Sequence, residues 1–209
     1  MRDARFLSLE GGEGAGKSTQ ARALAAALAA RGIDAVVTRE PGGSEGAEAI
    51  RALLMQGEAT RWSAQSEALL FAAARADHVE KVIRPALAAG QWVLCDRYID
   101  STRAYQGVAG GVDDAAILAL HAFGSGGLLP DRTFWLALPE ELGATRAATR
   151  DGVAADRFAR RGRDFHAAVA DAFSRFAAAE PQRFHRIDAT LPPEAVTQAM
   201  LDALADWLP

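Results

Sequence analysis

The chain has 209 residues, 50% of them hydrophobic and 24% charged, with a formal net charge of −4. This length and balance are typical of one compact globular domain and exclude a disordered chain. The negative net charge argues against a dedicated nucleic-acid-binding protein. A membrane span is excluded because no stretch approaches ~18 apolar residues. We also expect no signal peptide, and the single cysteine, Cys95, cannot form an internal disulfide, which fits a reducing cytoplasm.

Short apolar runs that suit strands alternate along the chain with longer segments that suit helices. The expected strands are Phe6–Leu9, Ala35–Thr38, Trp92–Cys95, Thr133–Leu138 and Phe184–Ile187. The expected helices are Lys17–Ala30, Glu45–Met55, Ser66–Ala89 (kinked or shortened by Pro85), Asp113–Phe123, Glu140–Arg150, Arg163–Ala179 and Pro193–Trp207. This alternation predicts an α/β fold in three layers: a five-stranded parallel sheet covered by helices on both faces. Segment 149–164, rich in Arg and Asp, is expected to be a solvated loop or a mobile lid.

A glycine-rich loop follows the first expected strand. Residues 11–18 read Gly-Gly-Glu-Gly-Ala-Gly-Lys-Ser, which matches G-x-x-x-x-G-K-[ST] at every fixed position, and a helix-forming run follows. In such a P-loop the backbone N–H groups converge on phosphate, Lys17 reaches the β- and γ-phosphates, and Ser18 ligates Mg²⁺. Only Lys17 and Lys81 are lysines among the 23 basic residues, which sets Lys17 apart from a general solubilising charge. The loop predicts a nucleoside triphosphate site.

Several kinds of protein use a P-loop, and the rest of the sequence separates them. A Ras-like GTPase reads guanine with an Asn-Lys-x-Asp motif, and this chain contains no asparagine. A translocating ATPase would bring further motor motifs and a larger or more basic body, and the sequence shows neither. The remaining large class transfers the γ-phosphoryl group to a small acceptor, and it needs a second anion site facing the first.

Arginines at the ends of the second and third strands supply such a site. The second strand ends in a Thr-Arg-Glu-Pro-Gly-Gly run over residues 38–43, and the third ends in Cys-Asp-Arg-Tyr over residues 95–98. Ligands bind at the carboxyl edge of open α/β sheets, so Arg39 and Arg97 could together bind a monophosphate through bidentate hydrogen bonds. Asp96, at the same edge, could be the acidic partner of Mg²⁺. Phe71 and Arg75 share one helix face and could stack on a base and bond its edge.

Together these motifs resemble those of the thymidylate kinase family, P-loop enzymes that phosphorylate dTMP to dTDP with ATP. The matching segments run in order from residue 5 to 190, and the Arg-Glu-Pro-Gly-Gly, Asp-Arg-Tyr and Ala-Tyr-Gln-Gly runs are far more specific than the P-loop. The matches are residues 10–19, 38–43, Phe71-x-x-x-Arg75, 96–98, 101–102, 104–107, 130–131, 156–158 and 187–189. The resemblance implies one P-loop kinase domain over residues 1–209, with ATP and dTMP as substrates, Mg²⁺ as cofactor, no nucleic-acid or membrane partner, and a homodimer formed through helices.

The resemblance also implies a role for each matching position. The ATP phosphates would be held by Gly11, Gly12, Glu13, Gly14, Ala15, Gly16, Lys17, Ser18 and Thr19, with Ser18 and Asp96 around Mg²⁺. The dTMP site would consist of Glu13, Arg39, Pro41, Phe71, Arg75, Arg97, Ser101, Thr102, Tyr105 and Gln106. Within it, Arg39 and Arg97 would hold the phosphate. Phe71 would stack on thymine with Arg75 at its edge, and Tyr105 would lie where a 2′-hydroxyl would clash. The catalytic residues would be Lys17, Arg97, Glu13, Arg150 and Arg157.

The same resemblance makes the segment over about residues 146–163 a lid that closes over ATP. Since the P-loop contains no arginine, the lid should supply a compensating cation. Its candidates are Arg146, Arg150, Arg157, Arg160 and Arg161. The chain departs from the family pattern at Ala159 with the residues 160–162 that follow it, at residues 108–111 and at residues 137–138, which bears on lid closure and not on the acceptor site.

Two alternatives stay open. The first is another nucleotide or nucleoside kinase, since deoxynucleoside kinases share the P-loop and an arginine motif near the third strand. Turnover of thymidine but not of dTMP would favour such a nucleoside kinase. A catalytically inactive nucleotide-binding module would share the fold, although the intact Lys17, Asp96 and Arg97 argue against it. Cys95 is expected to be a buried strand residue. The histidines His78, His121, His166 and His185 show no metal-ligand spacing.

Overall fold

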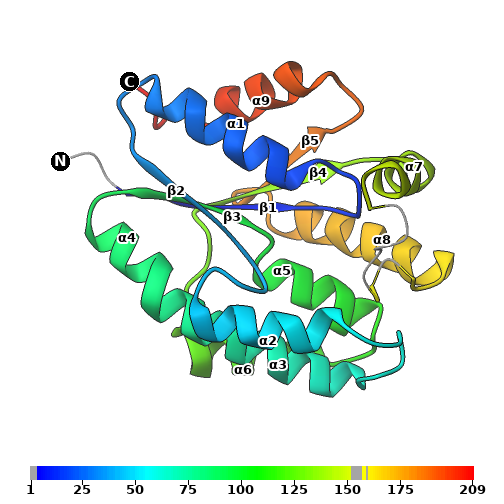
Figure 1. Cartoon of the computed structure of the whole chain (residues 1–209). Helices are drawn as coiled ribbons and strands as arrows, with labels where there is room; N and C mark the ends of the chain where they lie inside the picture. The colour runs from blue at the N-terminus through cyan, green and yellow to red at the C-terminus, as the bar shows by residue number, and fades with distance from the viewer. Residues whose placement is uncertain (1–3, 152–156, 159) are drawn as a thin grey trace.

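A central parallel sheet organises the molecule (Figure 1). The computed structural model describes residues 4–151, 157–158 and 160–209. Its strands are β1 Phe6–Glu10, β2 Ala35–Arg39, β3 Trp92–Asp96, β4 Arg132–Ala137 and β5 Phe184–Asp188. All neighbours pair in parallel, in the order β2-β3-β1-β4-β5. The predicted five-stranded parallel sheet is confirmed, with each strand within one residue of its expected bounds.

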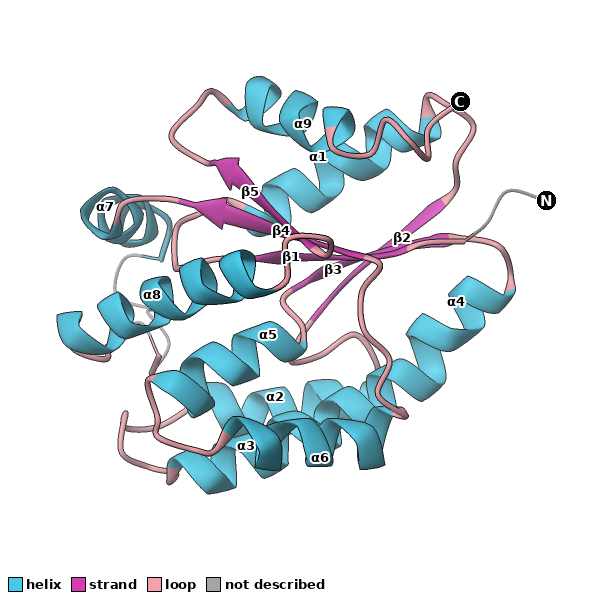
Figure 2. Cartoon of the chain, turned by 180° about the vertical axis from the view of Figure 1, so that it is seen from behind, coloured by secondary structure: helices cyan, strands magenta, loops and turns pink. Residues whose placement is uncertain are grey.

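Helices cover both faces of the sheet, as predicted (Figures 1 and 2). The helices are α1 Lys17–Ala29, α2 Glu45–Met55, α3 Ala64–His78, α4 Arg84–Ala88, α5 Ile99–Thr102, α6 Asp114–Ser125, α7 Glu140–Asp151, α8 Arg163–Ala179 and α9 Pro193–Asp202. Two π-helical segments, η1 Val79–Ile83 and η2 Arg103–Val108, join α3 to α4 and extend α5. One face carries α1 and α9, and the other carries α2 to α6 and α8. Of the described helices, none is long and apolar enough to cross a membrane.

The predicted helix 66–89 is interrupted one turn before Pro85. Proline lacks an N–H and its ring crowds the carbonyl four residues back, so the regular ladder cannot pass through it. The Arg84 N–H instead donates to the Val79 carbonyl, five residues earlier, which makes η1 a π-helical turn. Pro85 then lies in the first turn of α4, where a missing N–H costs nothing.

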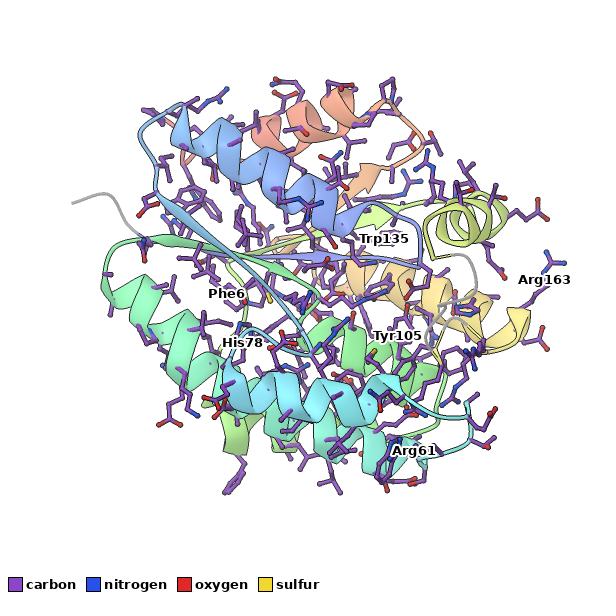
Figure 3. All side chains as sticks on the ribbon, in the orientation of Figure 1. Phe6, Arg61, His78, Tyr105, Trp135 and Arg163 are labelled. Carbon is purple, nitrogen blue, oxygen red and sulfur yellow. The ribbon has the colours of Figure 1, made fainter. Side chains whose placement is uncertain are left out.

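Alternation of side chains along the strands divides the core between the two faces. Leu7 and Leu9 of β1 pack with Leu24 of α1, whereas Phe6 packs on the opposite face with Ile83 and Cys95. Phe6 lies inside the molecule, while Arg163 extends from the surface at the start of α8 (Figure 3). The carboxyl ends of β1, β2 and β3 meet at one edge, and each leads directly into a segment that the sequence marks as functional.

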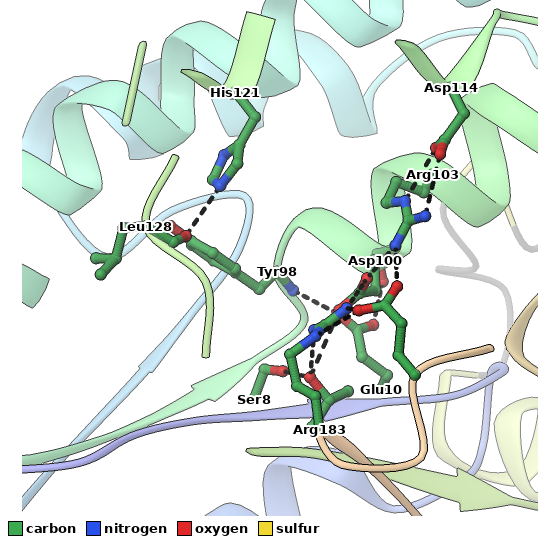
Figure 4. A network of polar contacts seen from close by, with 12 residues as sticks. Ser8, Glu10, Tyr98, Asp100, Arg103, Asp114, His121, Leu128 and Arg183 are labelled. Atoms are coloured by element: carbon green, nitrogen blue, oxygen red, sulfur yellow. Dashed lines mark hydrogen bonds and ion pairs between the residues drawn. The ribbon is translucent and has the colours of Figure 1, made fainter. Parts of the chain in front are cut away.

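A buried ionic network fixes α5 beneath the sheet (Figure 4). Asp100 is fully buried and accepts hydrogen bonds from Arg183 at 2.6 and 3.0 Å and from Arg103 at 3.1 Å. Arg183 also donates to Thr133 of β4, whose hydroxyl lies 2.9 Å from that of Ser8 on β1. Paired in this way the buried charges are tolerated, and the short α5, which the sequence did not predict, is anchored to β1 and β4.

Candidate active site

The P-loop wraps tightly between β1 and α1. Gly14 has φ +69°, and a Cβ at this position would lie 2.2 Å from the Gly143 carbonyl oxygen of α7, so only glycine fits. Lys17, at the start of α1, folds back over the loop and donates to the carbonyls of Gly11 at 3.1 Å and Gly12 at 2.8 Å. Burial lowers the pKa of Lys17 to about 8. The buried Lys17 ammonium therefore donates to two backbone carbonyls beside the loop, and it could exchange them for the more strongly accepting oxygens of a phosphate.

Ser18 and Asp96, the predicted magnesium pair, lie in direct contact. The Ser18 hydroxyl donates to Asp96 Oδ2 across the gap between α1 and β3. Among the described residues, no group of three or more His, Cys, Asp or Glu side chains could hold a metal ion. A single carboxylate with one hydroxyl fits Mg²⁺, because this ion keeps several waters and takes further oxygens from substrate phosphates.

An unusual backbone conformation and three side-chain hydrogen bonds hold Arg97 against the P-loop. Its φ is +68°, and it is the only non-glycine residue with positive φ in the described part of the chain. Such a conformation is strained for a long side chain and persists only where its surroundings fix it. The guanidinium donates to the Gly11 carbonyl at 3.1 Å, the Ser101 hydroxyl at 3.0 Å and Glu13 Oε1 at 3.0 Å. It also lies 5.1 Å from the centre of the Tyr105 ring.

Glu10, the last residue of β1, supports this arrangement from below. Its carboxylate is fully buried and accepts hydrogen bonds from the Tyr98 N–H at 2.8 Å and the Ser101 hydroxyl at 2.6 Å. Burial, with the nearby Asp100 charge, raises the pKa of Glu10 to about 7. Glu10 thus anchors both sides of the turn that carries Arg97. Sequence reasoning assigned it no role, although a carboxylate that ends an apolar strand was a usable signal.

A cavity of about 380 Å³ opens beside the P-loop, and we call it the P-loop cavity. Most of the predicted site residues line it, although they come from segments far apart in the chain. They are Glu13, Gly14, Gly16, Lys17, Ser18, Thr19, Arg39, Pro41, Phe71, Arg75, Asp96, Arg97, Ser101, Thr102, Tyr105 and Gln106. Gly11 and Gly12 contribute the carbonyls that receive Lys17, and Ala15 is buried in the core. The structure therefore brings both predicted anion grips to one cavity.

Aromatic rings and a buried arginine form the inner end of the P-loop cavity. Phe71 lies 5.9 Å from Phe158, between ring centres, and Phe158 lies 6.3 Å from Tyr105. Arg75 is 2% exposed, and its guanidinium donates to Glu40 at 2.8 Å and to Thr102 at 2.9 Å. Two nitrogens of the Arg75 guanidinium, Nε and Nη2, are therefore fixed, which sets the orientation of the whole group beside the aromatic rings. Glu40, a lining residue that sequence reasoning missed, stands in the same run as Arg39 and was overlooked because a strand-end glutamate more often faces solvent.

Arg39 lines the outer end of the P-loop cavity. Its side chain is 56% exposed and pairs with Glu48 of α2, at 3.1 and 3.2 Å from the two carboxylate oxygens. The same carboxylate accepts the Gly43 N–H at 3.0 Å. An exposed pair of this kind is weak, so Arg39 can turn toward a stronger anion at little cost.

The predicted lid arginines lie in different places. Arg157 is fully buried and donates to the Leu54 carbonyl at 2.5 Å and to Glu67 of α3, so in this structure it lies on the α2–α3 side and not among the residues lining the P-loop cavity. A buried guanidinium needs a carboxylate, and Glu67 supplies it. Arg161 also donates to Glu67, at 2.9 Å, whereas Arg146 donates to the Ala189 carbonyl at 3.0 Å and Arg160 is exposed. The Arg150 side chain and residues 152–156 and 159 lie outside the described part of the chain.

A second cavity of about 660 Å³ lies against Gly12 and Glu13, walled by the end of β4, α7 and α8. Glu13 lines both cavities, so the P-loop forms the partition between them. The loop thus has accessible space on two sides, one of which is the P-loop cavity with its cluster of cations.

Comparisons with known proteins show which family the chain belongs to. The family model described as "Thymidylate kinase" matches residues 9–200. A thymidylate kinase from Rhizorhabdus wittichii is 60% identical over 205 residues, covering 98% of this chain and 99% of that one. One from Caulobacter vibrioides is 51% identical over 208 residues, covering 100% and 99%. The crystal structure of thymidylate kinase from Ehrlichia chaffeensis matches with a TM-score of 0.78 and 31% identity, covering 96% of this chain and 98% of that chain.

These matches confirm the resemblance and do not favour the alternative of a nucleoside kinase. They span almost the whole chain, and the matched region includes the P-loop, the turn that carries Arg97 and the cavity between them. The chain therefore belongs to the thymidylate kinase family, enzymes that transfer the γ-phosphoryl group of ATP to dTMP and form dTDP.

Proposed function

We propose that the P-loop cavity binds dTMP and that the P-loop holds the phosphates of ATP. The observation that carries this assignment is the placement of Arg97. Its left-handed backbone and its hydrogen bonds to Gly11, Glu13 and Ser101 hold a half-buried guanidinium at the cavity that Lys17 also lines. Two cations from different elements thus face one space, as a transfer between two phosphates requires.

Within the P-loop cavity, the monophosphate of dTMP would lie between Arg97 and Arg39. Guanidinium groups bind phosphate through paired hydrogen bonds, and a phosphate would outcompete the exposed Glu48 carboxylate for Arg39. The thymine would stack on Phe71, with Arg75 at its edge. The sugar would lie against Tyr105, close enough to exclude a 2′-hydroxyl. Pro41, Ser101, Thr102 and Gln106 would complete the pocket.

The chemistry asks for alignment and charge neutralisation more than for a base. A phosphate oxygen of dTMP is already ionised near pH 7, so it can attack the γ-phosphorus without losing a proton. Lys17 on the donor side and Arg97 on the acceptor side would offset the charge spread over the transferring group. Ser18 and Asp96 would hold Mg²⁺, which neutralises phosphate charge when bound.

We also propose that a lid arginine, Arg150 or Arg160, supplies the compensating cation. Arg146, Arg157 and Arg161 have partners elsewhere in the structure, which leaves Arg150 and Arg160 as the candidates from the sequence. By analogy with arginine fingers, such a cation would contribute about 10³–10⁵ in rate. In this assignment residues 1–209 form one kinase domain whose lid spans about residues 146–163, and Arg157 contacts ATP only if it leaves Glu67.

The outer helices support a homodimer. Phe123 of α6 is 93% exposed, and Leu118 of α6 and Leu69 of α3 are 38% and 56% exposed. These two helices pack together in the layer farthest from the sheet (Figure 2). Large apolar side chains on adjacent helices are typical of association surfaces. Light scattering should give the mass of a dimer, and Phe123→Asp should give the mass of a monomer.

The free thiol of Cys95 and the use of ATP support a cytoplasmic location.

One assay tests the proposed reaction. Purified enzyme with ATP and Mg²⁺ is offered dTMP, dUMP, dCMP, dGMP or thymidine, and diphosphate and monophosphate products are separated by chromatography. We expect dTDP to form fastest and EDTA to stop the reaction. Phosphorylation of thymidine but not of dTMP would overturn the acceptor, and ATP binding without any product would indicate an inactive module.

A further inference from the structure

A buried carboxylate on α3 lies outside the roles assigned so far. Glu67 is 1% exposed and lies behind Gln106 at the inner end of the P-loop cavity. Its Oε1 accepts hydrogen bonds from Arg157 at 2.5 Å and Arg161 at 2.9 Å. Its Oε2 accepts one from the Nε2 of Gln106 at 2.8 Å. One negative charge thus joins two arginines to a residue that lines the cavity.

The chemistry of the carboxylate decides the orientation of the Gln106 amide. An ionised carboxylate only accepts hydrogen bonds, whereas an amide donates from its nitrogen and accepts at its oxygen. Gln106 must therefore turn its Nε2 toward Glu67, which leaves its carbonyl oxygen for the other side. Gln106 is 1% exposed and lines the P-loop cavity, so its hydrogen bond to Glu67, and not the available space, decides which end of the amide faces the cavity.

The two arginines prevent Glu67 from being replaced by a neutral amide without consequence. In a Glu67→Gln variant, the new amide would have to place its carbonyl oxygen toward Arg157 and Arg161, because both are donors. Its NH₂ group would then face Gln106 and force the amide of that residue to rotate by half a turn. The cavity would receive a donor where the native protein offers an acceptor.

We propose that Glu67 is a positioning residue that sets base specificity: it fixes the Gln106 carbonyl as an acceptor toward the base. Thymine and uracil carry an N–H at ring position 3, whereas cytosine carries an unprotonated nitrogen there, so an acceptor favours the first two bases and disfavours the third. The inference rests on the proposed function, since it takes the P-loop cavity as the dTMP site. Glu67 acts through Gln106 and touches no reacting atom.

The test compares kcat/KM for dTMP, dUMP and dCMP in three proteins: native, Glu67→Gln and the swap Glu67→Gln with Gln106→Glu. For Glu67→Gln we expect kcat/KM to fall about 10- to 100-fold for dTMP and by the same factor for dUMP, while the preference for dTMP over dCMP shrinks and the KM for ATP is unchanged. In the swap, the carboxylate introduced at position 106 again offers an acceptor to the base and receives the NH₂ group of the amide introduced at position 67. The preference for dTMP should therefore return.

Glu141→Gln is the matched control, because Glu141 is 87% exposed and pairs only with the surface residue Arg163 among its described ion pairs. It should leave all three kcat/KM values unchanged. If Glu67 were only part of a structural ion cluster, Glu67→Gln would lower Tm but leave the dTMP-to-dCMP ratio unchanged, and the inference would be wrong.

Two further outcomes keep the tests separate. The swap preserves the net charge of the cluster, so it can be compared with the native protein even if Glu67→Gln does not fold, and a lost dTMP preference in the folded swap would also refute the inference. A native enzyme that shows no preference for dTMP over dCMP would instead contradict the proposed function.

Discussion

Replacing Glu10 by Gln should change how the stability of the protein depends on pH. The Glu10 carboxylate is fully buried at the end of β1, and burial raises its pKa from 4.5 to about 7. The folded state therefore binds the Glu10 proton more tightly than the unfolded state does. Stability gained from this proton is fully present below pH 4.5 and is lost as pH rises from 4.5 to about 7.

The size of this effect follows from the shift. One pKa unit corresponds to ~1.4 kcal/mol, so a shift from 4.5 to about 7 lowers the free energy of unfolding by about 3 kcal/mol across this interval. Gln cannot ionise, but its carbonyl oxygen can still accept the Tyr98 N–H. Relative to the native protein, the Glu10→Gln variant should therefore be about 2.5 kcal/mol more stable at pH 8 than at pH 5, because part of the loss has already occurred at pH 5.

Urea unfolding of both proteins at pH 5 and pH 8 measures this difference. Groups that do not interact with Glu10 titrate equally in the two proteins, so their contributions cancel when the change between variants is compared across pH; Lys17, whose pKa burial lowers to about 8 and the Glu10 charge partly raises, is the group that does not cancel fully. A difference that stays below about 1 kcal/mol between the two pH values would show that Glu10 does not titrate near neutrality, and it would refute the reasoning from burial.

Three further substitutions test the site. Lys17→Ala should lower kcat about 10²- to 10³-fold with a Tm close to native, because the described partners of Nζ are two backbone carbonyls; a near-native kcat in steady-state assays would remove Lys17 from the phosphate site. Tyr105→Ala should reduce discrimination against the ribonucleotide form of TMP by about 10-fold or more, and equal kcat/KM ratios before and after would exclude Tyr105 from the sugar contact. Gly14→Ala should lower the free energy of unfolding by about 1–3 kcal/mol in thermal unfolding, because the added Cβ meets the Gly143 carbonyl at 2.2 Å. Gly162→Ala is the control and should cost far less, because no atom of the described residues beyond its chain neighbours lies within 4 Å of a Cβ added there.

Local patterns in the sequence were enough to predict the sheet and the P-loop. Apolar runs bounded by glycine and polar residues marked all five strands, because both faces of this sheet are covered and continuous burial leaves a clear trace. The spacing of Gly11, Gly16 and Lys17 carries its own structural requirement, so the loop could be recognised before its surroundings were known.

The segment from Ile99 to Val108 was missed because its stability comes from distant residues. Asp100 has its partners in Arg103 and in Arg183, which lies 83 positions away, and no helical periodicity of apolar residues marks the segment. A short helix that is anchored by a buried ionic network has little signal of its own.

The supporting carboxylates of the site were missed for a related reason. In the sequence, Glu67 stands in the first turn of a helix, where a glutamate is normally solvated and interacts with the helix dipole. Only the fold shows that Arg157, 90 positions later, comes to rest on it. Arg157 was expected at ATP because the family resemblance makes its segment a lid that supplies a cation, and the sequence cannot tell which of the lid arginines finds a buried partner.

A crystal structure with dTMP and an unreactive ATP analogue tests the central claim most directly. Arg39 and Arg97 should both contact the dTMP phosphate inside the P-loop cavity, and Lys17 should leave the Gly11 and Gly12 carbonyls for the β- and γ-phosphates. A dTMP molecule bound outside this cavity, or an Arg97 guanidinium turned away from its phosphate, would contradict the account.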